Sequence, residues 1–507
     1  MQSASFIYVL TCQLFVQDGV TLTIEAGATI YATGQGPTGA APAVIVEKGG
    51  MISADGSADA PITFTALDVS SSSATVDSDT DSDTGAAALG SRGKWGGLIL
   101  LGSAPTSVAT DTEVEGISGY SYGGTDPADS SGVLRYVRVW HGGAVVGADN
   151  EINGITFAGV GSGTVVEHCE VAFNADDGFE FFGGTVNVKY MSALFVKDDS
   201  FDSDQGYQGK GQFLFIMEGT EGDHAFEMDS QASKSGSLDS QPRSHPQFYS
   251  FTVLGGGTGE GVRGGELMHV NDGTGGKFGN AILAHGPDDG LLFEDCGDIS
   301  YTQTLDSSAD IGTGALGTTA STGYFYFSEN NLVSVAGTVF ANGDSSTCTG
   351  LSGLSSYVSA SPGFQSVSSA TLDYTNLPSG FNPLPSSSGA ACSGTKDTPE
   401  ADVDGFFEAV SCKGAFASAS DNWLAGWSWL DCANKMASTG ATDMCTSLPA
   451  SPFATLSNDV VAIGGAQTAD LHLDSSKSYL LTSQLFVPSG KSLTIPAGTP
   501  IFARPAH

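Results

Sequence analysis

A short acidic motif recurs in the middle of the chain at a nearly constant spacing. The segment 176–180, Asp-Asp-Gly-Phe-Glu, matches the segment 198–202, Asp-Asp-Ser-Phe-Asp, with a step of 198 − 176 = 22. A further copy at 223–227, Asp-His-Ala-Phe-Glu, follows with a step of 223 − 198 = 25, and 288–294 is a looser echo. A period in the low twenties with two or three short strands per turn is typical of one coil of a parallel β-helix.

The segments between the acidic motifs have the pattern of short β-strands. Within the segment 21–25, Leu22 and Ile24 lie on one face and the polar residues on the other, and Gly27 then interrupts this alternation. The 69 glycines and the near absence of long amphipathic Leu, Lys and Glu runs argue against a helical protein. We therefore predict an all-β chain folded as a parallel β-helix, a solenoid with long loop insertions.

The charge of the chain excludes two classes of partner. Its 56 acidic residues outnumber the 18 lysines and arginines, which gives a net charge of −38 at pH 7. Such a charge repels nucleic acid phosphates and anionic lipids, so we predict no nucleic acid partner. No stretch of the sequence approaches the ~18 to 20 apolar residues of a transmembrane helix, and we predict no membrane insertion.

Eight cysteines occur, and four of them lie in the last quarter of the chain: Cys392, Cys412, Cys432 and Cys445. An even number of cysteines clustered in a loop-rich region predicts disulfides and an oxidising compartment. No Cys-x-x-Cys or Cys/His ligand spacing occurs, which disfavours a zinc site. The segment 404–450 also contains three tryptophans. We expect it to pack over the helix as a C-terminal flap stapled by disulfides.

The sequence divides into four parts. We expect a β-helix core over 1–300, a Ser/Gly-rich insertion or decoration over 301–403, the flap over 404–450 and the start of a second repeat over 471–507. The last part is a copy of the beginning of the chain, because 8–32 and 479–503 are identical at 15 of 25 aligned positions, at an offset of 479 − 8 = 471. A chain that restarts in this way is either a slice of a tandem array or a subunit whose end pairs with its neighbour's first coil.

Several longer motifs carry a resemblance to known proteins, among them "GKWGGLI", "NEINGITFAGVGSGT" and "NADDGFEFFGG". With these motifs the chain resembles a large group of secreted or surface-anchored bacterial proteins that fold as right-handed parallel β-helices. The resemblance covers roughly 8–300 and 404–430, although that group has fewer cysteines and a shorter middle region. It implies a right-handed helix and an extracellular or cell-surface location, and it implies little about chemistry.

The repeated motifs place acidic residues in columns, because stacked coils lie about 4.8 Å apart and equivalent positions line up along the axis. Three columns are expected: Asp176, Asp198 and Asp223; Asp177, Asp199 and His224; Glu180, Asp202 and Glu227. Unit charges at this spacing repel by about 1 kcal/mol even in water. The eight carboxylates are therefore predicted ligands of Ca²⁺, which takes six to eight oxygens in loose geometry.

Two other interpretations of these carboxylates stay open. The aspartates can cap turns by bonding to the backbone, or they can form a catalytic cluster made of Asp176, Asp177, Asp198, Asp199 and His224. The phenylalanines of the same motifs, Phe179, Phe201 and Phe226, are expected to stack in the core as an aromatic ladder.

Two classes of function fit the sequence. The first is an extracellular structural protein, a repeat unit or subunit of a surface fibre, sheath or adhesin, which binds itself head to tail through 8–32 and 479–503. Surface polysaccharide would be a further partner. The alternative is a polysaccharide-active lyase or hydrolase on a β-helix, or a carbohydrate- or ice-binding module.

Overall fold

The computed structural model of the 507-residue chain describes most of the predicted helix core, the flap and parts of the C-terminal copy. The described residues are 8–34, 40–67, 91–114, 117–144, 152–230, 238–257, 265–297, 300–302, 324–344, 348, 362–366, 372–397, 405–436, 445, 460–466, 470–472, 478–496 and 501–503. None of the helices in these ranges is long and apolar enough to cross a membrane.

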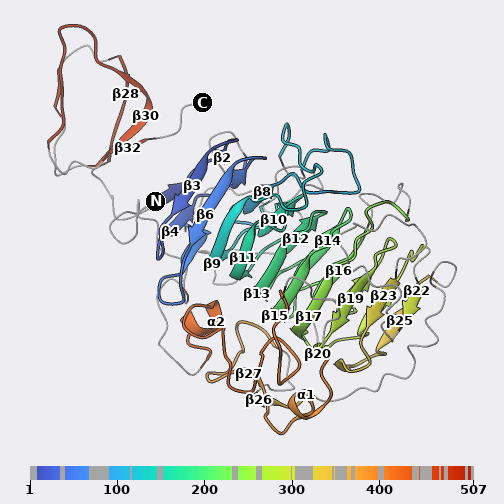
Figure 1. Cartoon of the computed structure of the whole chain (residues 1–507). Helices are drawn as coiled ribbons and strands as arrows, with labels where there is room; N and C mark the ends of the chain where they lie inside the picture. The colour runs from blue at the N-terminus through green and yellow to red at the C-terminus, as the bar shows by residue number, and fades with distance from the viewer. Residues whose placement is uncertain are drawn as a thin grey trace.

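Two long sheets form the main body, and their strands stack in a row in Figure 1. The larger one, sheet A, consists of β1 (Tyr8–Leu10), β3 (Thr21–Ile24), β4 (Thr29–Ala32), β6 (Met51–Asp55), β7 (Ile62–Ala66), β9 (Gly132–Trp140), β11 (Val165–Ala172), β13 (Asn187–Leu194), β15 (Lys210–Met217), β17 (Gln247–Leu254), β19 (Gly276–Gly279), β20 (Ile282–Gly286), β22 (Ser300–Thr302), β23 (Tyr324–Phe327) and β24 (Leu332–Val335). Sheet B consists of β2 (Leu14–Val16), β5 (Val44–Val46), β8 (Leu98–Leu101), β10 (Ile155–Ala158), β12 (Phe179–Phe182), β14 (Phe201–Asp204), β16 (Phe226–Met228), β18 (Met268–Val270), β21 (Leu291–Phe293) and β25 (Phe340–Asn342).

The chain alternates between these sheets, and neighbouring strands within each sheet are parallel. Strand β12 pairs with β14 so that Phe179 lies beside Phe201, and β14 pairs with β16 so that Phe201 lies beside Phe226. The observed register therefore equals the spacing of the sequence motif. The predicted parallel β-helix is confirmed.

The inward faces of the two sheets form one apolar core along the helix. Phe179, Phe201 and Phe226 are fully buried there, and their rings stack with centroids 4.9 Å and 5.5 Å apart. This is the predicted aromatic ladder. Because side chains alternate along a strand, the residue that follows each phenylalanine points out of the helix.

Five strands of sheet A bend at one residue each. These residues have positive φ angles of 49° to 61° although none is glycine: Tyr136, His168, Tyr190, Phe213 and Ser250. They occupy equivalent places in successive coils, and the first four carry rings that stack at centroid distances of 4.3, 4.3 and 4.8 Å. The bend thus creates a second aromatic stack on the outside of the helix.

The flap covers this outer stack. It contains the short helix α2 (Trp429–Cys432), and the chain before it adds β26 (Phe364–Ser366), β27 (Asn382–Pro385) and the short helix α1 (Ala390–Ser393). All of these elements lie along one side of the row of strands in Figure 1. The ring of Trp427 meets the edge of Tyr136 at 5.4 Å, and that of Trp423 meets Tyr190 at 5.7 Å. The tryptophans that the sequence singled out are thus the residues that attach the flap.

Two buried charges sit at the same junction. Glu170 on β11 accepts hydrogen bonds from the backbone N–H of Trp429 at 2.8 Å and from Trp140 Nε1 at 3.0 Å. Arg138 on β9 donates to the carbonyl oxygen of Trp427 at 2.8 Å. Both ionisable side chains are almost completely buried, and each makes one hydrogen bond to the backbone of the flap that is lost if the flap detaches.

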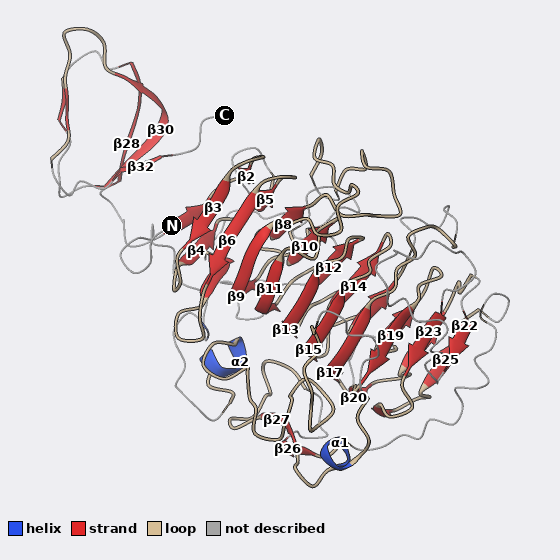
Figure 2. Cartoon of the chain, in the orientation of Figure 1, coloured by secondary structure: helices blue, strands red, loops and turns tan. Residues whose placement is uncertain are grey.

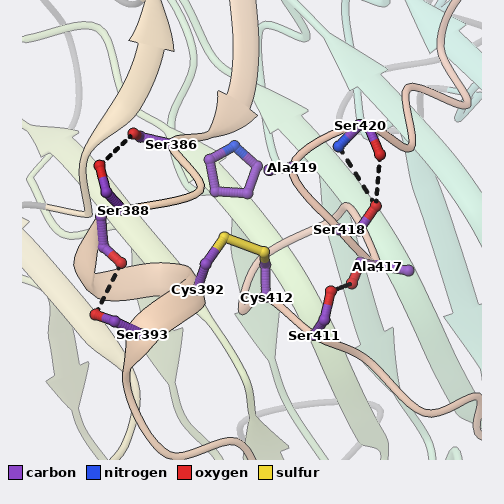
Figure 3. The surroundings of a disulfide bond; sticks show 12 residues. Ser386, Ser388, Cys392, Ser393, Ser411, Cys412, Ala417, Ser418, Ala419 and Ser420 are labelled. Atoms are coloured by element: carbon purple, nitrogen blue, oxygen red, sulfur yellow. Dashed lines mark hydrogen bonds between the residues drawn. A yellow bond between two sulfur atoms is a disulfide. The ribbon is translucent and has the colours of Figure 1, made fainter.

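Three disulfides are present: Cys296–Cys348, Cys392–Cys412 and Cys432–Cys445. The second joins α1 to the loop that precedes the tryptophans, and Figure 3 shows it among serine hydrogen bonds such as that from Ser411 Oγ to the Ala417 carbonyl oxygen, 3.0 Å. The predicted disulfide-stapled flap is therefore confirmed. Cys12 and Cys169 are free thiols.

The strands after residue 300 continue both sheets. A Ser/Gly-rich insertion or decoration is expected over 301–403, yet β23 and β24 extend sheet A and β25 extends sheet B. Phe325 and Phe327 of β23 are buried in the same core as the phenylalanine ladder. This part of the chain thus contributes a further coil as well as loops.

The C-terminal copy forms its own small sheets, drawn apart from the row of strands in Figure 2. The first sheet consists of β30 (Ser478–Phe486) and β32 (Ile501–Ala503) of the copy together with β28 (Val460–Ala466), which precedes the copy. All three strands are parallel. The second contains β29 (Leu471–His472) and β31 (Leu493–Thr494).

Candidate metal centre

The acidic residues of the repeated motif line the outer face of sheet B. Parallel pairing places Glu180 beside Asp202, Asp202 beside Glu227 and Glu227 beside His269. Each of these residues follows a core residue in its strand, so the column faces outward. The predicted Glu180/Asp202/Glu227 column is therefore present, and it continues into a histidine.

A second column lies in the turns that enter these strands. Asp177 Oδ1 accepts the backbone N–H of Asp199 at 3.0 Å, and Asp199 Oδ1 accepts the backbone N–H of His224 at 2.9 Å. Each carboxylate thus binds the equivalent residue of the next coil. These aspartates join neighbouring coils, whereas the capping interpretation has them bond the backbone of their own turns.

Two groups of carboxylates have a spacing suited to a cation. In one, Asp176, Asp177 and Asp198 each offer an oxygen within 4.8 Å of the others. In the other, Asp177, Glu180 and Asp202 do so. Asp177 belongs to both groups, so it links two neighbouring sets of carboxylates, five side chains in all, on two adjacent coils. We refer to these five as the five-carboxylate site.

The electrostatics of this site favour a cation. Burial raises the pKa of Asp177 well above its usual value, and the charges of Asp176 and Asp199 raise it further. Burial also raises the pKa of Asp202, with contributions from Glu180 and Glu227. Asp202 Oδ1 is buried and has no hydrogen-bond partner among the described residues. A hard divalent cation would replace the missing partner and offset the repulsion.

The other three predicted ligands have different neighbours. Asp199 Oδ1 lies 2.8 Å from His224 Nδ1, and Asp223 Oδ1 lies 4.0 Å from His224 Nε2. Glu227 Oε1 lies 3.3 Å from His269 Nδ1. These three carboxylates therefore face histidines, whereas the other five face one another.

Each histidine lies between two carboxylates. Besides Asp199, His224 contacts Glu266 Oε1 through Nε2 at 3.4 Å. Burial opposes its charged form, but the hydrogen bonds to Asp199 and Glu266 outweigh burial and raise the pKa of His224 to about 11. For Glu227, burial favours the neutral form, but the hydrogen bond from His269 leads the opposing effects, which lower the pKa to about 2.

These values bear on the catalytic interpretation of Asp176, Asp177, Asp198, Asp199 and His224. A general base needs a pKa near the working pH and a free lone pair. His224 is held as an imidazolium by Asp199 and Glu266, so it is poorly placed to accept a proton at neutral pH. The geometry favours ion binding over acid–base chemistry.

Sequence reasoning missed Glu266, His269 and Glu294. The coil that carries Glu266 and His269 repeats the motif with a step of 266 − 224 = 42, which puts Glu266 at the position of His224 and His269 at that of Glu227. A search limited to steps in the low twenties passes over it. The segment 265–270, Gly-Glu-Leu-Met-His-Val, would have been found by allowing one longer coil.

Comparison with known proteins gives one family. The sequence profile of the family described as "Pectate-lyase like beta helix domain" matches residues 2–78 and 82–311. No curated protein matches this chain. A solved structure that matches is full-length tailspike protein 2 from the Escherichia coli O157:H7 bacteriophage CAB120, with 10% sequence identity and a TM-score of 0.20. That match covers 64% of this chain and 38% of the tailspike chain, less than half of its length.

Proposed function

The chain belongs to the family of pectate-lyase-like β-helix domains, and from this premise we propose that it is an extracellular structural protein whose units join end to end. The unit would be part of a surface fibre, sheath or adhesin. The family accounts for the helix, while the proposal of assembly is supported by the C-terminal copy.

The C-terminal copy repeats the strand pairing of the first coil as well as its sequence. In the first coil Tyr8 pairs with Ile30, and in the copy Tyr479 pairs with Ile501. Both partners are shifted by the same amount, since 479 − 8 = 501 − 30 = 471. The copy therefore starts a β-helix with the register of the first coil.

The observation that carries the proposal is a difference in exposure between the two copies. Val16 and Ile24 are buried in the first coil, at 3% and 2% exposure. Their counterparts Val487 and Ile495 are 40% and 49% exposed. The same apolar side chains thus face a core in one copy and solvent in the other, which supports the proposal that a further coil covers them.

The first coil of another unit can supply that cover. Among the described strands β1 pairs only with β4, and β2 only with β5, so within this part of the chain each of them forms an edge of its sheet. Adding a parallel strand satisfies the backbone groups of such an edge. Contacts that join the end of one unit to the start of the next are heterologous and build open filaments.

Ca²⁺ would stabilise each unit rather than the contact between units. The acidic site spans neighbouring coils, and a bound cation would hold them together along the axis. Ca²⁺ binding is thus a separate element of the proposal, which can fail without affecting the assembly.

The proposed contact between units can be tested at the exposed residues Val487 and Ile495. Charging it in Val487→Glu/Ile495→Glu should prevent association, because two buried carboxylates would face an apolar core. Met51→Glu is the matched control, since Met51 is also an exposed apolar residue, at 39%. Sedimentation velocity should show higher assemblies for the wild type and the control but single units for the double variant. If the double variant assembled to the same extent as the wild type, the proposed contact between units would be refuted.

A further inference from the structure

We propose that His224, Glu266 and His269 form a binding site for a divalent transition metal of the Zn²⁺ type. This site is separate from the five-carboxylate site described above and does not depend on end-to-end assembly. His224 lies in the turn before β16, Glu266 in the turn before β18, and His269 within β18.

The stacking of two coils brings the three residues together. Strands β16 and β18 are neighbours in sheet B, with Glu227 beside His269. Each of the three residues offers one ligand atom within 4.8 Å of the other two. The imidazole rings lie with their centroids 5.3 Å apart, and His224 Nε2 is 3.4 Å from Glu266 Oε1.

In both imidazole rings, Nδ1 lies near a carboxylate. Nδ1 of His224 lies 2.8 Å from Asp199, and Nδ1 of His269 lies 3.3 Å from Glu227. In each case the carboxylate belongs to the preceding coil. A carboxylate that accepts the Nδ1 proton leaves Nε2 for a metal, which would displace the second proton of the His224 imidazolium as it binds. Metal-binding histidines are commonly oriented in this way.

Within the described part of the chain, the second ring nitrogen of His269 has no hydrogen bond that a metal would have to replace. His269 Nε2 is buried and makes no hydrogen bond among the described residues, although Glu294 Oε2 lies 3.4 Å away. A metal bound by the two Nε2 atoms and Glu266 would use it, with Glu294 near enough to act as a fourth ligand.

The ligand types select the class of metal. Imidazole suits Zn²⁺ and its neighbours in the first transition row, whereas Ca²⁺ prefers oxygen ligands alone. Two imidazoles and a carboxylate therefore favour Zn²⁺ over Ca²⁺ here, and the all-carboxylate site favours the reverse. The sequence lacks a cysteine-based zinc pattern, but a site made of histidine and glutamate needs no cysteine.

Calorimetric titration of the full chain with Zn²⁺, in excess Ca²⁺ to occupy the carboxylate site, tests the proposal. We expect one Zn²⁺ per chain, and at least a tenfold loss of Zn²⁺ affinity in His269→Gln and in Glu266→Gln. His285→Asn, a histidine change in β20 of sheet A, should bind Zn²⁺ as the wild type does.

Circular dichroism of each variant shows whether the β-helix is intact, and Glu266→Gln removes a ligand charge with almost no change in shape. An intact wild type that takes up no Zn²⁺ would overturn the proposal. Unchanged Zn²⁺ affinity in folded His269→Gln would overturn it as well.

Discussion

Asp177 Oδ1 lies 3.0 Å from the backbone nitrogen of Asp199, the equivalent residue of the next coil. The same contact recurs between Asp199 and His224 at 2.9 Å. Acidic side chains thus connect coils along the axis despite their mutual repulsion. At one end of the columns carboxylates face one another, and at the other end they face histidines, so the charge is compensated differently along the helix.

Removing Ca²⁺ should lower the melting temperature of the wild-type protein. A ligand at 100 times its dissociation constant stabilises the folded state by about 2.7 kcal/mol. The shift in melting on adding EGTA should be lost in Asp202→Asn, which removes a ligand charge. Asp223→Asn is the control, because Asp223 lies outside both cation-spaced groups. A wild type that melts at the same temperature with and without EGTA contradicts Ca²⁺ binding.

Attachment of the flap should weaken as the pH rises from about 4.5 through about 7. Burial raises the pKa of Glu170 from 4.5 to about 7, more than its hydrogen bonds lower it. A raised carboxyl pKa means that the folded state binds the proton more tightly, so this contribution is fully present below pH 4.5 and is lost through pH 7.

Glu170→Gln is neutral at every pH and should flatten this part of the stability curve. Glu167→Gln, on the same strand but with a side chain 40% exposed, should leave the curve unchanged. Urea unfolding at several pH values, in saturating Ca²⁺ and followed by tryptophan fluorescence, measures the effect. If the free energy of unfolding of Glu170→Gln changed between pH 4.5 and pH 7 as steeply as that of the wild type, Glu170 could not be the source of this pH dependence.

The flap should lose stability when its disulfides are removed. Cys392→Ser/Cys412→Ser is expected to cost about 2 to 5 kcal/mol, because the bridge restricts the unfolded chain. Cys12→Ser should cost little, since Cys12 is a free thiol and its counterpart in the C-terminal copy is Ser483. Mass spectrometry of the unreduced protein gives a direct check. Free thiols at Cys412 and Cys432 would show that packing alone holds the flap.

The sequence predicted side-chain positions best where the acidic motif repeats at a short, nearly constant spacing. Phe179, Phe201 and Phe226 could be placed in one column because a shift of one residue would turn the apolar face to water. The acidic column beside them follows from the same alternation. The predictions for these residues needed only the spacing of the motif.

Other features had no such local signal. His269 escaped detection because its coil is longer than those before it and a histidine replaces the acid of the motif. The bend at Tyr136 and Tyr190 uses left-handed backbone in tyrosines, which rarely adopt it, so side-chain identity gave no warning. The burial of Glu170 depends on Trp429, which is 259 residues away along the chain. Disulfide pairing among eight cysteines allows 105 arrangements and is decided only by the fold.

Electron microscopy of the full chain beside a deletion of 471–507 tests the end-to-end account most directly. The full chain should form filaments with a regular axial repeat, because the first coil of one unit covers the apolar face at Val487 and Ile495 of another. The deletion should leave the main β-helix folded, as judged by circular dichroism, and should yield only single particles. Filaments of the truncated protein with the same axial repeat as the full chain would contradict the account.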